Sequence, residues 1–149
     1  MNIFAIDIGT KTGWALLQRG DKLTGGTKHF KPKKSEPQAI RWSRFREWLR
    51  ETVTDVHAVY FEDVKAHAGV LAAHAYGGYL AILEMHCQLR NIPCNPVGVG
   101  VIKKHWAGKG NADKEAMINE ARRRGFSVVD DNHADALAIL SYAVKEETK

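Results

Sequence analysis

The chain has 149 residues, of which 44% are hydrophobic and 26% are charged. This composition is that of an ordinary globular protein and excludes a fibrous or disordered chain. At this length we expect residues 1–149 to form a single domain whose core needs neither disulfides nor a structural metal. The 22 Lys and Arg residues outnumber the 17 Asp and Glu residues, and the net charge of +5 favours a polyanionic partner.

Cysteine content and hydropathy predict a cytoplasmic protein with no membrane partner. The two cysteines, Cys87 and Cys94, form neither a disulfide framework nor a metal-binding spacing, which is typical of a reducing compartment. No apolar run approaches the roughly 20 residues that a membrane-spanning helix needs. The first residues, Met1–Ile8, lack the basic start and the small-residue cleavage site of a signal peptide.

The first third of the chain predicts an antiparallel meander followed by a helix. Short turns, one of them at Gly9, separate three strands that we expect over Asn2–Asp7, Thr12–Gln18 and about Lys22–Phe30. A polar connector with a proline near each end, Lys31–Pro37, then leads into a helix over about Gln38–Thr52.

The rest of the chain predicts strands that alternate with helices. The apolar run Val56–Phe61 indicates a buried strand reached by a parallel crossover, and Asn91–Val97, with two prolines, indicates an edge strand. We expect a long helix over Ala66–Arg90, a short helix or turn over about Val99–Trp106, and helices over Lys114–Arg124 and Asp131–Lys145. The order βββαβαβαα predicts an α/β fold with a mixed five-stranded sheet, three antiparallel strands plus two parallel, flanked by helices.

Three acidic residues lie at or near the ends of predicted apolar elements: Asp7, Glu62 and Asp135. Burying a carboxylate without compensation is costly, and a divalent cation offers that compensation. Mg²⁺ prefers oxygen ligands, and two such ions can activate a water molecule and stabilise the leaving oxygen of a phosphodiester. The three positions therefore predict a metal site that holds two Mg²⁺ ions.

A fourth ligand is available on the last predicted helix. Asp131 lies four residues before Asp135 and shares its face, and Asn132, three residues before it, borders that face. Each acid also has an ordinary structural interpretation: Asp7 could begin a turn, Glu62 could be a solvated acid at a strand end, and Asp130 or Asp131 could cap the helix. Asp135 favours the metal site, because it lies inside an apolar helix face where a carboxylate needs a partner.

The motifs resemble those of the RuvC family of Holliday junction resolvases. The resemblance rests on the sequences of Asp7–Ala15, Phe61–Asp63 and Asp135–Ala138, and it extends to Val101–Lys104 and Asp113–Glu115. The stretch Lys103–Lys114 is most similar to the phage and prophage branch of that family. The resemblance implies an RNase H-like fold and a Mg²⁺- or Mn²⁺-dependent endonuclease that works as a homodimer and nicks symmetric strands of a four-way junction. It also implies the cytoplasm of a bacterial cell or of a phage-infected host.

By this resemblance Asp7, Glu62 and Asp135 match three of the family's metal-binding carboxylates. The family's fourth ligand, an Asp or His three residues before the last aspartate, falls on Asn132, which can ligate through its amide oxygen but adds no charge. We therefore keep both Asn132 and Asp131 as candidate catalytic and metal-binding residues. Lys114 matches a position where the family has a catalytic or DNA-contacting lysine, and lysine suits a phosphate or a developing oxyanion.

We predict DNA contacts through basic residues within a glycine-containing loop and on both sides of it: Lys103, Lys104, Lys109 and Lys114. The resemblance adds His67, because the segment after Glu62 meets the DNA in this family while its helix packs across the dimer axis. The small residues of that helix, Ala72, Ala73, Gly77 and Gly78, suit such a seam. The alternative is that the lysines form an ordinary solvated surface and that His67 has no ligand role.

Two other classes of function stay open. If Asn132 breaks the metal site, the chain would be a catalytically weak or inactive protein that binds branched DNA. An actin- or sugar-kinase-like nucleotide-binding domain also carries an Asp-x-Gly-Thr hairpin, but those proteins need two such domains around the nucleotide. The YqgF-like branch of the same fold is less similar, because its usual Asp-Glu-Arg motif is absent here.

Overall fold

The computed structural model describes residues 1–149 and contains one mixed sheet with the strand order β3-β2-β1-β4-β5. The strands are β1 (Ile3–Asp7), β2 (Lys11–Gln18), β3 (Lys22–His29), β4 (Ala58–Asp63) and β5 (Cys94–Gly98). The first three pair antiparallel, and β4 and β5 run parallel to β1. The predicted mixed sheet is confirmed, and the proline-containing β5 lies at its edge as expected.

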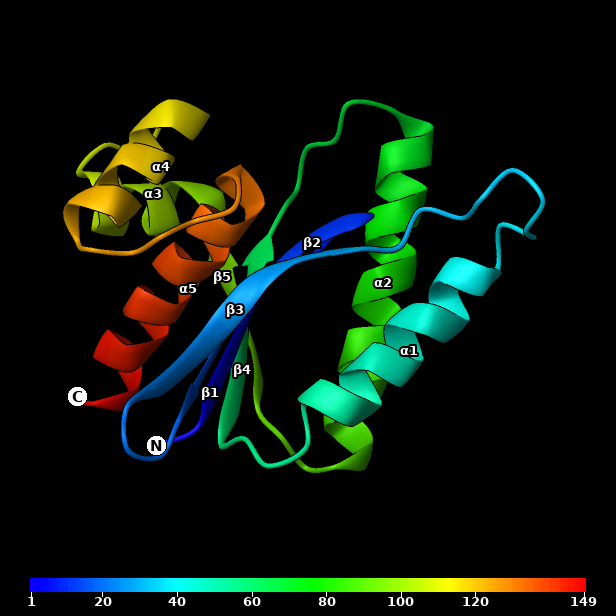
Figure 1. Ribbon diagram of the computed structural model, residues 1–149, viewed down its shortest axis with the longest axis horizontal. Coiled ribbons are helices and arrows are strands. Elements are labelled where there is room, and N and C mark those ends of the chain that lie inside the picture. The colour runs from blue at the N-terminus through cyan, green and yellow to red at the C-terminus, as the bar shows by residue number, and fades with distance from the viewer.

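Helices cover both faces of this sheet, as Figure 1 shows. They are α1 (Ile40–Thr52), α2 (Val70–Leu89), α3 (Val99–Ala107), α4 (Lys114–Arg123) and α5 (Asp131–Glu147). The pair α1 and α2 packs on one face, and α5 packs on the other with α3 and α4 beside it. None of these helices is both long and apolar enough to span a membrane.

Strand alternation divides the apolar residues into two cores and decides which way the acids face. In β1, Ile3 and Ala5 belong to the core under α5, and Phe4 and Ile6 belong to the core under α1 and α2. Successive side chains of a strand point to opposite faces, so Asp7 continues the α5-facing row. The same alternation in β4, where Ala58 and Tyr60 face α5, directs Glu62 to that side as well.

Several predicted element bounds differ from the structure; the edge strand expected over Asn91–Val97, for example, spans Cys94–Gly98. The short helix or turn expected over about Val99–Trp106 is a helix over Val99–Ala107, so the chain ends in three helices and the order is βββαβαβααα. The strand expected over Val56–Phe61 instead spans Ala58–Asp63, because its pairing with β5 continues through Glu62 and Asp63. Polar side chains at these two positions had indicated a strand end, but the parallel ladder extends the strand through both.

The long helix expected over Ala66–Arg90 begins four residues later, at Val70. Gly69 has an extended backbone, with φ 164° and ψ −178°, so no helix can run through it. Residues 64–69 therefore form a loop between Glu62's strand and α2. This loop lies at the end of the sheet that carries the acids.

Candidate metal centre

The three predicted acids converge at one end of the sheet. Each of Asp7, Glu62 and Asp135 offers a carboxylate oxygen, and these atoms all lie within 4.8 Å of one another. Because β1 and β4 are parallel neighbours in register, Asp7 and Glu62 leave the sheet side by side on the α5-facing surface. Asp135, about one turn into α5, reaches the same point from the helix.

The electrostatic environment of the three acids is that of a cation-binding site. Burial first, and then the charges of Glu62 and Asp135, raise the pKa of Asp7 well above its usual range. Burial and the charges of Glu62 and Asp131 raise the pKa of Asp135 to about 7, although Lys103 and Lys114 oppose this shift. None of the three clustered acids forms an ion pair with a lysine or arginine. A buried group of carboxylates that repel one another and lack a cationic partner has the donor set that Mg²⁺ or Mn²⁺ prefers.

The first turn of α5 is held to the sheet by its cap. Asp130 is the N-cap, and its Oδ1 accepts hydrogen bonds from the His133 backbone N–H at 2.9 Å and from the Thr27 hydroxyl of β3 at 2.6 Å. Of the two capping candidates, Asp130 takes the role and Asp131 is left inside the first turn. The orientation of Asp135 towards the sheet follows from this attachment.

The two candidate fourth ligands lie at the rim of the cluster. Asp131 is close enough that its charge raises the pKa of both Asp7 and Asp135, and its Oδ2 lies 3.7 Å from Lys114 Nζ. The side chain of Asn132 lies close enough to Asp130 to help lower the pKa of that cap. Asp131 and Asn132 both remain predictions as metal ligands. The charge of Asp131 acts on the clustered acids, whereas Asn132 lies beside the cap residue Asp130.

Gly13 is a site residue that sequence reasoning missed. It is the register partner of Asp7 on β2, and a Cβ built there would lie 1.9 Å from the backbone oxygen of Asn132. Only a glycine allows the first turn of α5 to pack this closely against β2. An isolated glycine within a strand pattern was the available signal, since such a residue often marks a close backbone approach.

Gly13→Ala is expected to displace the start of α5, to lower the free energy of unfolding by about 3 kcal/mol, and to reduce metal binding. Urea unfolding and Mn²⁺ titration measure the two effects. Gly26→Ala is the matched control, because the nearest atom to its new Cβ, Trp14 Nε1, lies at an ordinary 3.8 Å. Equal stability of the two variants would contradict this account of the close packing.

Positive charge lies beside the acids on α3 and α4. Lys103, half-buried on α3, and Lys114, in the first turn of α4, both act on the pKa of Asp135 and so lie near it. Lys104 and Lys109 are exposed, the latter in the α3–α4 loop. The structure therefore brings two of the four predicted DNA-contacting lysines to the acidic cluster, and the other two lie on the adjoining surface.

Tyr76 of α2 supports Glu62 from the opposite side. Its hydroxyl donates to the Glu62 carbonyl oxygen at 2.8 Å and accepts from the Val64 backbone N–H at 3.1 Å. The ring of His67 lies 4.9 Å from the Tyr76 ring, centroid to centroid, so His67 is half-buried in the loop before α2. This pairing could not be predicted from sequence, because it depends on how α2 packs beneath the end of β4.

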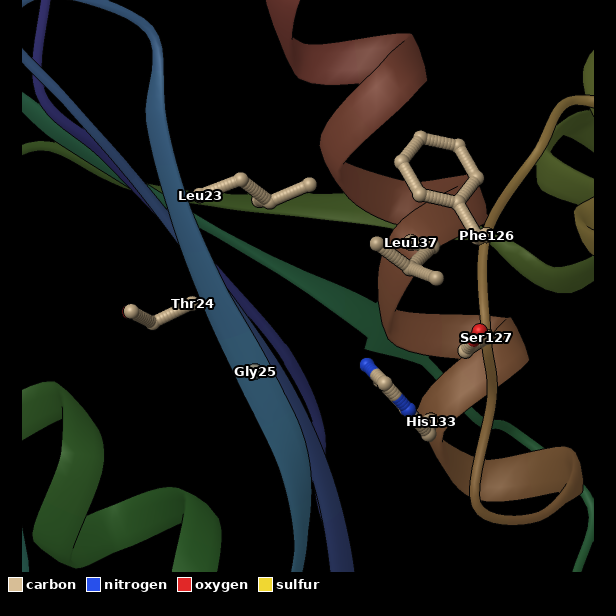
Figure 2. Close-up of a pocket in the computed structure, with 7 residues that line it drawn as sticks. All are labelled: Leu23, Thr24, Gly25, Phe126, Ser127, His133 and Leu137. Atoms are coloured by element: carbon tan, nitrogen blue, oxygen red, sulfur yellow. The ribbon is translucent and has the colours of Figure 1, made fainter.

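Figure 2 shows a separate hollow of about 340 Å³ between β3 and the first turns of α5. It is lined by Leu23, Thr24, Gly25, Phe126, Ser127, His133 and Leu137. No carboxylate and no lysine lines it, and it contains none of the predicted site residues. The acidic cluster, and not this pocket, holds the chemistry that the sequence predicts.

Solved structures similar to this chain are Holliday junction resolvases. Thermus thermophilus RuvC in complex with a Holliday junction substrate superposes with a TM-score of 0.75 and 25% identity, over 99% of this chain and 96% of that one. A second structure of T. thermophilus RuvC has a TM-score of 0.70 and 24% identity over the same shares. The yeast mitochondrial resolvase Ydc2 shares the fold, with a TM-score of 0.62 and 14% identity over 93% of this chain and 75% of its own.

Scans of protein-family models and of curated protein sequences find no match to this chain. The structural likeness, in contrast, extends over almost the whole of both chains. It agrees with the strand order and with the resemblance that the motifs carry. The chain thus has the RNase H-like fold of the RuvC Holliday junction resolvases, and the RuvC resemblance predicted from its sequence is confirmed.

Proposed function

We propose that the chain is a crossover junction endodeoxyribonuclease, which resolves Holliday junctions and related branched DNA by paired symmetric nicks. The observation that carries the proposal is the convergence of Asp7, Glu62 and Asp135 within 4.8 Å on a RuvC fold. A similar RuvC structure contains a Holliday junction substrate, which supports four-way DNA as the substrate class. We expect it to act in the cytoplasm of a bacterial cell or of a phage-infected host.

Asp7, Glu62 and Asp135 would hold two Mg²⁺ ions, with Asp131 or Asn132 as a further ligand. When bound, such ions activate the attacking water and stabilise charge on the leaving oxygen. With the ions bound, the three carboxylates would carry negative charge in a partly buried site, where electrostatic interactions are stronger than in water. Lys114, held beside Asp131, would supply a positive charge to a phosphate oxygen that develops charge.

We propose that α2 forms the seam of a homodimer. Val70 and Leu71 at its start are 84% and 85% exposed, which is unusual for aliphatic side chains and favours a partner surface. Gly77 has open space around it and would allow a second helix to approach closely. Gly78 was predicted for the same seam, but it packs inside the chain, because a Cβ there would lie 2.5 Å from the ring of Trp42.

The function is tested with labelled four-way, three-way and linear duplex DNA in Mg²⁺ and in Mn²⁺. We expect paired, symmetric nicks on the four-way substrate alone and none in EDTA. Junction binding that is unchanged without metal, with no nicking in Mn²⁺, would instead identify a binding protein that lacks catalysis. ATP hydrolysis independent of DNA would identify a nucleotide-binding domain and refute the proposal.

A further inference from the structure

A cluster of unpaired polar groups lies beside the turn that follows Asp7, on the α1 and α2 side of the sheet. Its members are Thr10, in the turn between β1 and β2, Arg41, in the first turn of α1, and Tyr79, in the middle of α2. The Tyr79 hydroxyl lies next to both Thr10 and Arg41, whose interactions with it oppose the effect of burial on its pKa. Residues that are far apart in sequence thus meet at the end of the sheet that carries the acids.

Two atoms of this cluster lack hydrogen-bond partners although they are buried. Tyr79 is fully buried, and its hydroxyl makes no hydrogen bond of good geometry, nor does Arg41 Nε. Buried polar groups are nearly always satisfied, so an unsatisfied pair next to a surface turn favours a ligand whose binding brings Tyr79, Thr10 and Arg41 into hydrogen-bonding geometry with one another. The Thr10 hydroxyl likewise donates to no protein acceptor, although its backbone oxygen accepts from the Phe30 N–H at 2.8 Å.

The charge of Arg41 is also uncompensated. No carboxylate lies within ion-pair distance of it, whereas its neighbour Arg44 is paired with Glu36. Its guanidinium carbon lies 4.3 Å from the centroid of the Trp42 ring, and this stacking fixes the plane of the group. A planar guanidinium with free N–H donors matches the oxygens of a phosphate. Lys11, exposed next to Thr10, adds a second positive charge.

We infer that Arg41 and Thr10 bind a backbone phosphate of the DNA strand that enters the acidic cluster, with Tyr79 as a positioning residue beneath them. In this arrangement the Tyr79 O–H donates to Thr10 Oγ1, which leaves the Thr10 proton free to donate to a phosphate oxygen. Three residues of chain span about 10 Å at most, so Thr10 lies within about three nucleotides of Asp7 along a strand. The inference rests on the proposed nuclease function and adds a second phosphate contact to its site.

The first test measures junction affinity in EDTA at several salt concentrations for the full chain. Arg41→Gln is expected to weaken binding about tenfold and to lower the slope of log Kd against log salt by about one, since one phosphate contact contributes about 0.9. Arg46→Gln is the matched control, because Arg46 is exposed on the same helix and forms no ion pair. Equal behaviour of the two variants would overturn the inference.

The second test locates the contact with junctions that carry one uncharged methylphosphonate linkage. Wild-type protein is expected to lose affinity when the neutral linkage lies within about three nucleotides of the cleaved bond, and Arg41→Gln is expected to lose nothing further there. An equal penalty in both proteins would overturn the assignment of this phosphate to Arg41.

Tyr79→Phe separates positioning from folding. Because the hydroxyl makes no hydrogen bond in the structure and is proposed to donate to Thr10 only when a phosphate is bound, its removal should leave the melting temperature unchanged while weakening junction binding about threefold. A lower melting temperature with unchanged affinity would refute the positioning role. Failure of the wild-type protein to bind or cleave junctions would count against the nuclease function itself, whereas normal wild-type activity with a silent Arg41→Gln would count against this contact alone.

Discussion

Asp7→Asn is expected to abolish junction cleavage while leaving junction binding within about twofold of wild type. Burial and the charges of Glu62 and Asp135 all act on Asp7. Replacing its carboxylate by a neutral amide removes a charge that would hold the metal, and losses on the order of 10³-fold are typical when a charge-stabilising group is removed from an active site. Single-turnover cleavage in Mg²⁺ and junction binding in EDTA measure the two quantities.

The matched control is Asp21→Asn. Asp21 lies in the turn between β2 and β3, at the opposite end of the sheet from Asp7, and its φ of 59° is one that asparagine also adopts readily. This variant should cleave and bind as wild type does. If Asp7→Asn loses junction binding together with cleavage, Asp7 has a structural role and the account of the acidic cluster fails.

Asp135→Asn is expected to stabilise the metal-free protein at pH 8. Burial and neighbouring acids raise the pKa of Asp135 to about 7 in the folded chain, so the folded protein holds a proton that the unfolded chain releases. Stability therefore falls as pH rises from about 4 to about 7, and the deficit is complete above that window. Below pH 4 both states are protonated and the deficit vanishes. The variant should gain about 2–4 kcal/mol, or roughly 5–15 °C in melting temperature for a chain of this size.

Asp130→Asn should behave in the opposite way, which makes it a contrast on the same helix. Hydrogen bonds from Thr27 and the His133 N–H hold the pKa of Asp130 below its usual range against the effect of burial, so its charge stabilises the folded chain above pH 4. The loss of stability should be small, because an asparagine side chain still accepts both hydrogen bonds and only the charge is lost. Mg²⁺ should raise the melting temperature of wild type at pH 8 and have little effect on Asp135→Asn. A melting temperature of Asp135→Asn at or below that of wild type in EDTA would contradict the prediction.

The sheet and the three acids were predictable because short-range rules govern them. The apolar, β-branched segment Asn2–Asp7 and the apolar run before Glu62 indicate strands whatever the rest of the chain does. A carboxylate inside the apolar face around Asp135 indicates a partner for the same local reason. Element bounds were less predictable, as β4 shows, because pairing with β5 carries the strand through two acidic residues.

The remaining parts of the site depend on contacts between distant elements. Gly13 is needed only because α5 crosses β2 at that point, and Gly78 is needed only because α1 brings Trp42 against α2. The cap role of Asp130 over Asp131 follows from the position of Thr27 on β3. None of these relations is encoded by spacing along the chain, because each is created by the angle at which two elements pack.

By itself, the sequence determined the strand order along the chain, the identity of the acids and the basic character of their surroundings, since periodicity and local composition report burial. Only the tertiary structure decided that the carboxylates of Asp7, Glu62 and Asp135 lie close together. It also decided that Thr10, Arg41 and Tyr79 lie near one another beside them. The physical reason is that such convergence depends on register between strands and on helix packing over a face. Strand register and helix packing both depend on the burial of many apolar side chains together. No short sequence motif encodes that sum.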